Sequence, residues 1–416
     1  MGQWLGTRVE VEVTNVAHGG VAVARHEGRV IFVSDAIPGE TVLVQITDDS
    51  KKAFWRADTV SVRSPSPHRQ PHVWKAASVD RAPENRAGGA EFGHIELSHQ
   101  RELKRQVLTD ALARMAGIHS DVLVEPARLP APDGGPADGT GWRTRVRLQV
   151  GEDGTPGPFS ARSHRVIPVT ELPLATPEVT AIAPLTERFP GARHVDLVAP
   201  STGNPYVLVE DGRRRRPIAI TERVGERDFR LDARGFWQVH RGAALTLTRA
   251  VQDAVDPLRF DPRADNLDLY GGVGLLAAAL ADGAGGSVRL TSVESDAAAS
   301  AHAAQNLAEW DAATVADRVD RYLRRRAASD GRDEKAAMAG ATVLLDPPRS
   351  GAGKAVVDLL AQCAPAQLIY VACDPVALAR DVALLKDRGY ELDRLRAYDL
   401  FPHTHHVEAV ARLVRA

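Results

Sequence analysis

The C-terminal part of the chain alternates between short apolar runs and helical segments, and this alternation constrains the fold more than any other feature. From about residue 244, the runs NLDLY, SVRLTSVE, ATVLLD and LIYVAC are separated by segments with helical spacing, such as LTLTRAVQDAV, GLLAAALA and KAVVDLLAQC. Strands that alternate with helices predict a parallel, doubly wound α/β sheet over residues 243–416. In such a sheet, ligands bind at the carboxyl ends of the strands.

Short strands dominate residues 1–62. RVEVEV alternates strictly, which places Val9, Val11 and Val13 on one face, and VAVARHEGRVIFV contains a hairpin that turns at His26-Glu27-Gly28. Strands at this spacing predict a small β-barrel. The strings GGVAVAR and IPGE resemble the TRAM domain, and the resemblance implies an OB-like, RNA-binding barrel.

Residues 63–242 are expected to form a central, mostly β domain. It includes one helix over 98–116, because apolar residues recur there every four positions and Gly117 suits the position after a helix. YVLVEDGRRRRPIAI predicts a hairpin that turns at Asp211-Gly212.

Arginines gather in this central segment. WRTRVRLQV predicts a strand with Arg143, Arg145 and Arg147 on one face. Residues 143–250 contain 17 Lys and Arg against 12 Asp and Glu, a balance of +5. Such a balance favours a surface that binds a polyanion such as RNA, although an uneven scatter of solvated charges would have the same composition.

A glycine-rich turn, DLYGGVG, follows the first strand of the C-terminal region and opens a helix. Gly272 and Gly274 permit a tight turn and a close approach of the backbone to a ligand. Glu294 ends the next strand, where a carboxylate can accept hydrogen bonds from ribose hydroxyls. The pattern predicts a nucleoside cofactor, and GVGLLA taken alone also satisfies the G-x-G-x-x-A pattern of nicotinamide enzymes.

Three more groups are predicted at the same edge of the sheet. Asp346 begins DPPRSG, a stiff turn with exposed carbonyl groups that suits the edge of a flat base. Cys373 ends the strand LIYVA beside a polar turn, so its thiolate could be a nucleophile, whereas Cys363 lies on a helix among apolar residues and is expected to be inert. Glu408, in the turn that leads into the last strand, could be a general base.

These groups together suit one reaction. C5 of uracil is a poor nucleophile toward a methyl sulfonium, but addition of a thiolate to C6 turns C5 into an enolate-like carbon that can accept a methyl group. A base must then remove the C5 proton before the thiol can leave. The chain supplies a cysteine, a carboxylate and a nucleoside-cofactor turn at one sheet edge.

The strings DLYGGVG, DPPRSG, VACDPVALARD and FPHTHHVE, with GFWQVH upstream, occur in the order found in RNA uridine-C5 methyltransferases, and the chain resembles this family over essentially its whole length. The resemblance implies a class I enzyme that uses S-adenosylmethionine to make 5-methyluridine in structured RNA through a covalent cysteine–C6 adduct. It implies Cys373 as nucleophile and Glu408 as base, and cofactor-binding roles for Gln238, Tyr270, Glu294, Asp320 and Asp346. Because relatives with a TRAM domain more often modify ribosomal RNA, we expect rRNA rather than tRNA as substrate.

The sequence departs from the family pattern at several places. Gly271 and Ala372 stand where a cysteine and a serine are usual. The stretch over residues 68–94, where many members carry four cysteines that bind an iron–sulfur cluster, contains no cysteine, so no such cluster and no other metal site is expected. Asp374 follows the nucleophile where asparagine is usual, and its charge could raise the pKa of the thiol and slow attack. His240 replaces another asparagine. These departures bear on rate and substrate rather than on the class of reaction.

Other hypotheses stay open from the sequence. The DPPR turn resembles the D-P-P-Y turn of methyltransferases that act on exocyclic amines of nucleic acids, and an RNA-binding protein with a decayed active site or a nicotinamide enzyme would share part of the pattern. No apolar run approaches the roughly 18 residues of a membrane helix, and the N-terminus has no signal-peptide pattern. We therefore expect a cytoplasmic monomer that binds RNA and not a membrane.

Overall fold

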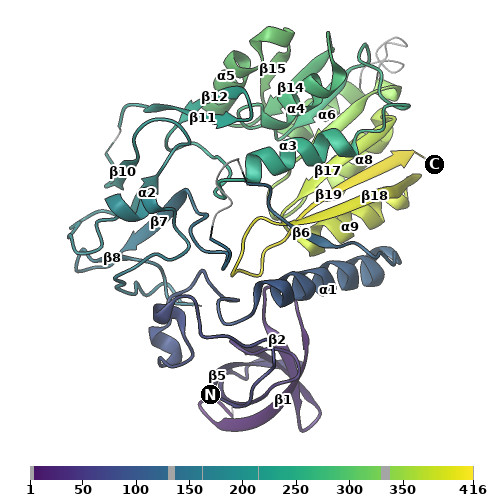
Figure 1. Cartoon of the computed structure of the whole chain (residues 1–416). Helices are drawn as coiled ribbons and strands as arrows, with labels where there is room; N and C mark the ends of the chain where they lie inside the picture. Colours follow the sequence, from purple (N-terminus) through teal and green to yellow (C-terminus); the bar gives the residue numbers. More distant parts are fainter. Residues whose placement is uncertain (1–3, 130–135, 162, 214, 329–337, 416) are drawn as a thin grey trace.

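The computed structural model describes residues 4–129, 136–161, 163–213, 215–328 and 338–415. An N-terminal barrel, a group of small central sheets and a large C-terminal α/β sheet follow one another along the chain (Figure 1). This architecture confirms the predicted fold class. Among the described residues, every helix is too short or too polar to cross a lipid bilayer.

The N-terminal barrel is closed by five strands in the order β1-β2-β3-β5-β4. Val9, Val11 and Val13 are buried inside it, as the alternation in RVEVEV predicts. The turn between β2 and β3 has positive φ at Glu27 and Gly28, which is the backbone that a two-residue hairpin with right-handed strand twist requires. The strands are β1 (Arg8–Val16), β2 (Ala22–His26), β3 (Arg29–Ser34), β4 (Thr41–Asp48) and β5 (Phe54–Ser64).

The C-terminal sheet has eight strands in the order β15-β14-β13-β16-β17-β19-β18-β6. β19 runs antiparallel to both of its neighbours, and the other adjacent strands are parallel. The chain moves from β13 to β14 on one side and later to β16 on the other, so the carboxyl end of β13 is the expected ligand crevice. The strands are β6 (Val124–Pro126), β13 (Asn266–Leu269), β14 (Leu290–Glu294), β15 (Ala313–Ala316), β16 (Thr342–Leu345), β17 (Gln367–Ala372), β18 (Tyr390–Asp399) and β19 (Glu408–Arg415).

Helices cover both faces of this sheet, because its central strands are apolar on both sides. One face packs against α3 (Ala243–Ala254), α4 (Leu275–Ala284) and α5 (Ala297–Asn306). The other packs against α1 (Leu97–Ala116), α6 (Val319–Ala327), α8 (Gly353–Cys363) and α9 (Pro375–Lys386).

Helix α1 confirms the helix predicted over 98–116, and it ends at Gly117 with φ +63. It packs against α9, and in Figure 1 it lies between the barrel and the C-terminal sheet. β6 pairs with β18. Two elements that precede residue 243 in the sequence therefore pack with the C-terminal sheet, and the predicted division of the chain at residues 62 and 242 stays a proposal.

The central region contains a four-stranded sheet in the order β10-β9-β7-β8 and a separate hairpin of β11 and β12. The predicted hairpin at Asp211-Gly212 is wrong, since β10 pairs with β9 and β11 pairs with β12. Pro217, which lacks an N–H donor, follows the arginine run and interrupts strand pairing there. The elements are β7 (Arg145–Val150), β8 (Pro156–Gly157), α2 (Pro177–Ile182), β9 (His194–Val198), β10 (Tyr206–Glu210), β11 (Ala219–Val224) and β12 (Arg227–Asp232), with short 3-10 helices at Lys75–Ala77 and Pro83–Asn85. A further 3-10 helix, Ala308–Trp310, lies between α5 and β15 in the C-terminal region.

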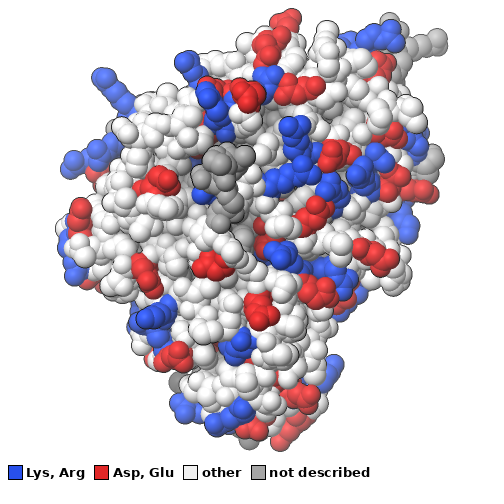
Figure 2. Space-filling model, viewed as in Figure 1, with Lys and Arg blue, Asp and Glu red and all other residues white. Residues whose placement is uncertain are grey.

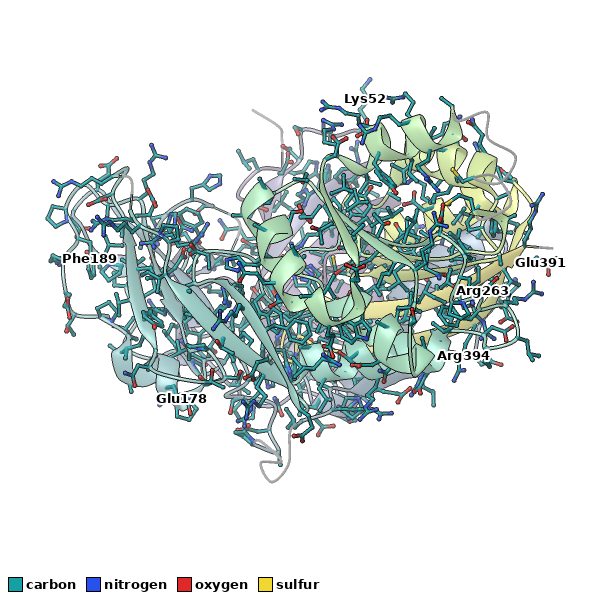
Figure 3. All side chains as sticks on the ribbon, turned by 90° about the horizontal axis from the view of Figure 1, so that it is seen from above. Lys52, Glu178, Phe189, Arg263, Glu391 and Arg394 are labelled. Carbon is teal, nitrogen blue, oxygen red and sulfur yellow. The ribbon has the colours of Figure 1, made fainter. Side chains whose placement is uncertain are left out.

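Seen from above, the central region and the C-terminal sheet lie end to end (Figure 3). Glu178 and Phe189 mark the outer end of the central region, and Arg263, Glu391 and Arg394 mark the opposite end of the molecule. The strand ends that carry the predicted site residues face the central region between these two ends.

Candidate active site

A cavity of about 1040 Å³ is lined by residues of both the C-terminal sheet and the central region. Seven of the nine predicted site residues line it: Gln238, Tyr270, Gly272, Glu294, Asp346, Cys373 and Glu408. Gly274 and Asp320 do not. Gly274 instead opens α4 in the left-handed region with φ +93, and Asp320 forms an ion pair with Arg318 at 2.9 Å.

The glycine turn after β13 is tight on its inner side and open on its outer side. Gly272 has φ +54, and a Cβ added there would meet no atom within 4 Å. A Cβ on Gly271 would lie 2.1 Å from the Ser292 hydroxyl oxygen. The backbone N–H of Gly272 donates a hydrogen bond to Glu294 Oε2 at 3.1 Å. This open turn beside a strand-end carboxylate fits a nucleoside such as that of S-adenosylmethionine.

Asp268, which the sequence motifs did not assign to the site, lies directly beneath this turn. Its side chain is fully buried, and Ser292 Oγ donates a hydrogen bond to its Oδ2 at 3.3 Å. Burial raises the pKa of Asp268 to about 7. The signal was present in the sequence, because Asp268 is a carboxylate between two leucines, Leu267 and Leu269, in a short buried strand.

Cys373 and Glu408 are neighbours because their strands pair. β17 and β19 are antiparallel with Ala372 opposite Ala409, so the next residues along the pair are Cys373 and Glu408. Both face the cavity, and Asp346, which follows the neighbouring strand β16, lines it beside them. The geometry thus brings together the three groups that the sequence predicted at this edge.

The charges around Cys373 favour its neutral thiol. Burial, then Glu408 and Asp346, raise its pKa to about 12, and Arg349 acts in the opposite direction. Burial also raises the pKa of Asp346 to about 7 and that of Glu408 well above its ordinary value. Glu408 is buried, and Cys373 and Asp346 are half-buried. These three acids share one wall of the cavity, and groups with shifted pKa values are common where protons are exchanged during a reaction.

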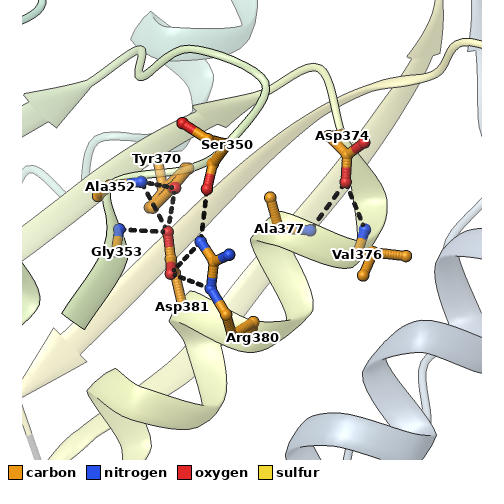
Figure 4. Close-up of polar contacts among 9 residues, drawn as sticks. All are labelled: Ser350, Ala352, Gly353, Tyr370, Asp374, Val376, Ala377, Arg380 and Asp381. Carbon is orange, nitrogen blue, oxygen red and sulfur yellow. Dashed lines mark hydrogen bonds and ion pairs between the residues drawn. The ribbon is translucent and has the colours of Figure 1, made fainter.

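The turn that carries Asp346 is held by a buried carboxylate (Figure 4). Asp381 Oδ2 accepts hydrogen bonds from the backbone N–H of Ala352 at 2.7 Å and from the Tyr370 hydroxyl at 2.7 Å. Arg380 donates to the Ser350 carbonyl oxygen at 2.7 Å. These contacts join the helix that follows Cys373 to the loop that follows Asp346. They therefore fix the position of Cys373 relative to Asp346.

Several residues of the cavity wall were not predicted. Arg349 lines the cavity and donates to His406 Nε2 at 3.3 Å. Its place after the two prolines of DPPRSG is the sequence feature that could have indicated it. Glu91 also lines the cavity, but it comes from an irregular segment far away in the sequence, where no pattern marks it. Arg143 lines the cavity too, although WRTRVRLQV predicted it only as part of an arginine face.

His240, one of the departures from the family pattern, has a structural role. It is buried, stacks on Trp142 with 5.4 Å between ring centroids, and accepts a hydrogen bond from the Gly242 N–H at 3.0 Å. Burial lowers its pKa to about 4. Neutral His240 thus accepts a hydrogen bond within the turn that precedes α3, and an asparagine side chain can accept the same kind of bond.

The predicted arginine face of β7 is mostly occupied by protein partners. Arg145 donates to the carbonyl oxygens of Ala233 and Gly235 at 3.1 and 2.8 Å, and Arg147 forms a bidentate pair with Asp196 at 2.7 and 2.8 Å. On the face shown in Figure 2, basic and acidic side chains are interspersed. The strand therefore offers RNA fewer free charges than its sequence indicates.

No group of three or more His, Cys, Asp or Glu side chains within the described ranges could hold a metal ion. The open glycine turn, the Glu294 carboxylate and the adjacent cavity fit a nucleoside cofactor.

Comparisons with known proteins agree with this geometry. A family model of tRNA (uracil-5-)-methyltransferases matches residues 248–416, and a TRAM domain model matches residues 3–58. The chain is 36% identical to an uncharacterized RNA methyltransferase of Streptomyces avermitilis, over 98% of each chain. It is 27% identical to the 23S rRNA (uracil(1939)-C(5))-methyltransferase RlmD of Shewanella sp. strain ANA-3, over 98% of this chain and 96% of that one.

Among solved structures, the Pyrococcus abyssi tRNA (uracil-54, C5)-methyltransferase in complex with S-adenosyl-L-homocysteine has the same fold. Its TM-score is 0.67 at 24% identity, over 97% of this chain and 99% of that chain. The whole-length similarity, the two family models and the strand-end site agree, and the chain belongs to the TRAM-containing RNA uracil-C5 methyltransferases, a family of S-adenosylmethionine-dependent enzymes.

Proposed function

We propose that this enzyme transfers a methyl group to C5 of a specific uridine in structured RNA through a covalent bond between Cys373 and C6. The observation that carries the proposal is the pairing of β17 with β19, which sets Cys373 beside Glu408 in the wall of a cavity that the glycine turn also lines. A nucleophile for C6, a base for the C5 proton and a cofactor turn thus share one cavity.

The steps follow from these positions. S-adenosylmethionine, when bound, supplies an electrophilic methyl group on a positively charged sulfur. Cys373 Sγ gives its proton to solvent and bonds to C6, which moves the electrons of the C5–C6 double bond toward O4. C5 then takes the methyl group, and the electron pair of the broken bond stays on the donor sulfur. Glu408 removes the C5 proton, the double bond forms again and the Cys373–C6 bond breaks.

The cofactor contacts are proposed from the same wall. Glu294 would accept hydrogen bonds from the ribose hydroxyls, and Gly272 would let the backbone approach the nucleoside. Gln238, Tyr270 and Asp346 line the same cavity and would contact the rest of the donor. The target base would be turned out of its stack to reach this wall.

Ribosomal RNA is the proposed substrate class. The TRAM match and the full-length similarity to a protein named as a 23S rRNA methyltransferase support it. Mass spectrometry of nucleosides from 23S rRNA and from tRNA should show loss of 5-methyluridine from the rRNA alone when the gene is deleted. Loss from tRNA would make tRNA the substrate.

The two cysteines allow a matched test of the mechanism. Cys373→Ala should reduce methyl transfer at least about a thousandfold, because it removes the nucleophile, while affinity for S-adenosylmethionine changes little. Cys363→Ala, on the far end of α8, should remain active. RNA with 5-fluorouridine at the target should form a denaturation-resistant adduct with the wild type and with Cys363→Ala only.

An active Cys373→Ala enzyme would refute the covalent route. If its product were then an N-methylated base, the enzyme would be an exocyclic-amine methyltransferase that uses the DPPR turn. If neither the wild type nor any variant bound S-adenosylmethionine, the chain would be a catalytically decayed RNA-binding protein.

A further inference from the structure

The loop between β1 and β2 brings the N-terminal barrel into contact with the catalytic wall, by which we mean Cys373, Asp346, Glu408 and the residues next to them. His18 Nε2 lies 2.8 Å from Asp374 Oδ2, and Asp374 directly follows Cys373. His18 and Cys373 also line a second, smaller cavity of about 120 Å³. The barrel therefore supplies part of the surroundings of the proposed nucleophile.

Tight packing at Gly20 holds this loop in place. Gly20 has φ +74, and a Cβ added there would lie 2.5 Å from the Cβ of His405. His405 belongs to the segment that leads into β19. The loop thus contacts the chain next to Cys373 and the chain that precedes Glu408, and its position relative to both is fixed.

Asp374 divides its two carboxylate oxygens between different partners. Oδ1 accepts hydrogen bonds from the backbone N–H groups of Val376 at 3.0 Å and Ala377 at 2.8 Å, and so caps α9 (Figure 4). Oδ2 accepts from His18. Because an asparagine could cap the helix equally well, capping does not account for the charge of Asp374. The imidazole of His18 is the partner that matches it.

We propose that His18 is a positioning residue that neutralises Asp374 and thereby favours the thiolate form of Cys373. An unpaired Asp374 would place a negative charge one residue from a thiol that already faces Glu408 and Asp346. With His18 protonated, the pair is close to neutral. This inference rests on the proposed role of Cys373, and it makes the reactivity of Cys373 depend on a barrel that is seated on the catalytic wall.

The surrounding charges support this assignment. The hydrogen bond to Asp374 raises the pKa of His18, against the effect of burial. Burial favours neutral Asp374, but the bond to His18 and the backbone donors outweigh it, and the pKa of Asp374 is lowered. Both shifts favour the charged pair near neutral pH. The other ionisable groups around the small cavity or in contact with it are Glu91, Lys104, Arg349, His405 and His406.

Thiol alkylation tests the proposal without RNA. In full-length protein with Cys363→Ala, Cys373 is the one remaining cysteine, and its rate of reaction with iodoacetamide can be measured from pH 7 to pH 10. His18→Gln keeps a hydrogen-bond donor but loses the charge, so alkylation near pH 7.5 should slow about three- to fivefold, an effect reduced by the half-exposed position of His18. His18→Lys should restore the rate and extend it to higher pH. His119→Gln, which removes an exposed imidazole elsewhere, should have no effect.

A second set of variants separates charge from structure. Asp374→Asn should speed alkylation, and adding His18→Gln to it should change nothing further, because no charge is left to neutralise. A His18→Gln rate equal to the wild type, or an equal slowing in the Asp374→Asn background, would overturn the proposal. Loss of methylation in Cys373→Ala together with unchanged alkylation in His18→Gln would refute this inference and leave the covalent mechanism intact.

Discussion

The catalytic wall and the joint between the barrel and the central region differ in whether their ionisable side chains are paired with opposite charges. At the wall, Cys373, Asp346 and Glu408 are acids opposed by Arg349, and the pKa of each acid is raised. At the joint, which we define as residues 65–96, buried charges are paired. Arg86, only 2% exposed, donates to Asp35 Oδ2 at 2.7 Å and to the carbonyl oxygens of Thr59, Val79 and Arg81.

A second ion pair of the joint shows the same pattern. Arg69 donates to both carboxylate oxygens of Glu40, at 2.5 and 2.7 Å, and to the Asp35 carbonyl oxygen at 2.9 Å. Glu40 is fully buried. Residues 68–94 contain no cysteine, and the chain links the barrel to its neighbour here with guanidinium groups. Removing one partner of a buried ion pair destabilises the fold. Acids with raised pKa values instead retain their protons near neutral pH and can exchange them during a reaction.

Glu408→Gln should give the largest effect and should separate the two regions most clearly. Loss of the base should lower turnover between about 10²- and 10⁴-fold, and a covalent protein–RNA species should accumulate with ordinary uridine. The free energy of unfolding should be unchanged or higher, because the variant removes a buried acid. Gel analysis of denatured reactions and urea melts measure the two quantities. Normal turnover would assign the base to another residue.

Arg86→Met should show the reverse pattern. It leaves Asp35 without its cation and removes the Arg86 donor from three carbonyl oxygens, so the free energy of unfolding should fall by about 3–5 kcal/mol. The turnover of the folded fraction should change little. Arg63→Met is the matched control, because Arg63 is 51% exposed in its pair with Glu10, and such surface pairs contribute about 1 kcal/mol or less. Equal effects of the two variants would contradict the contrast between wall and joint.

The wall could be predicted from the sequence and the joint could not. Each predicted wall residue follows or begins an apolar strand, and parallel strands bring their carboxyl ends to one edge, so sequence position fixes location in space. Residues 65–96 bury apolar side chains such as Trp74, Phe92 and Ile95 at irregular spacing. They have no hydrophobic period, and the buried ion pairs of the joint use partners from distant segments. The arginines of β7 were predicted on one face, but their partners Asp196 and Glu222 come from other strands. The strand pairing beyond Asp211 could not be predicted for the same reason.

The raised pKa of Asp268, which lies beneath the glycine turn, predicts how stability depends on pH. Asp268 has a folded pKa of about 7, above the ordinary value of about 3.9. Folded Asp268 therefore binds more protons than the unfolded chain between about pH 4 and pH 7, and its contribution to stability is complete below pH 4 and disappears as pH rises through 7. Asp268→Asn should flatten this part of the pH dependence, by at most about 4 kcal/mol. Urea melts at pH 5 and pH 8 measure it. An unchanged slope would mean that Asp268 is ionised in the folded enzyme.

The smallest expected effect concerns RNA binding. It distinguishes exposed arginines from arginines whose side chains bind protein acceptors. Arg213 and Arg215 are 81% and 46% exposed and share one partner, Asp211, whereas Arg145 and Arg147 are committed to protein acceptors. Replacing Arg213, Arg215 and Arg216 with serine should lower the magnitude of the slope of log affinity against log salt by about 0.7–0.9 for each RNA phosphate that the variant no longer binds.

Affinity for S-adenosylmethionine should not change in that variant. Arg263→Ser is the control, because Arg263 is 91% exposed and lies at the opposite end of the molecule (Figure 3). Fluorescence anisotropy with a labelled RNA at several salt concentrations gives the slopes. An equal slope in the triple variant and the wild type would show that these arginines are only solvated. RNA affinity would then have to come from the barrel and the cavity rim, where Arg143 and Arg349 lie.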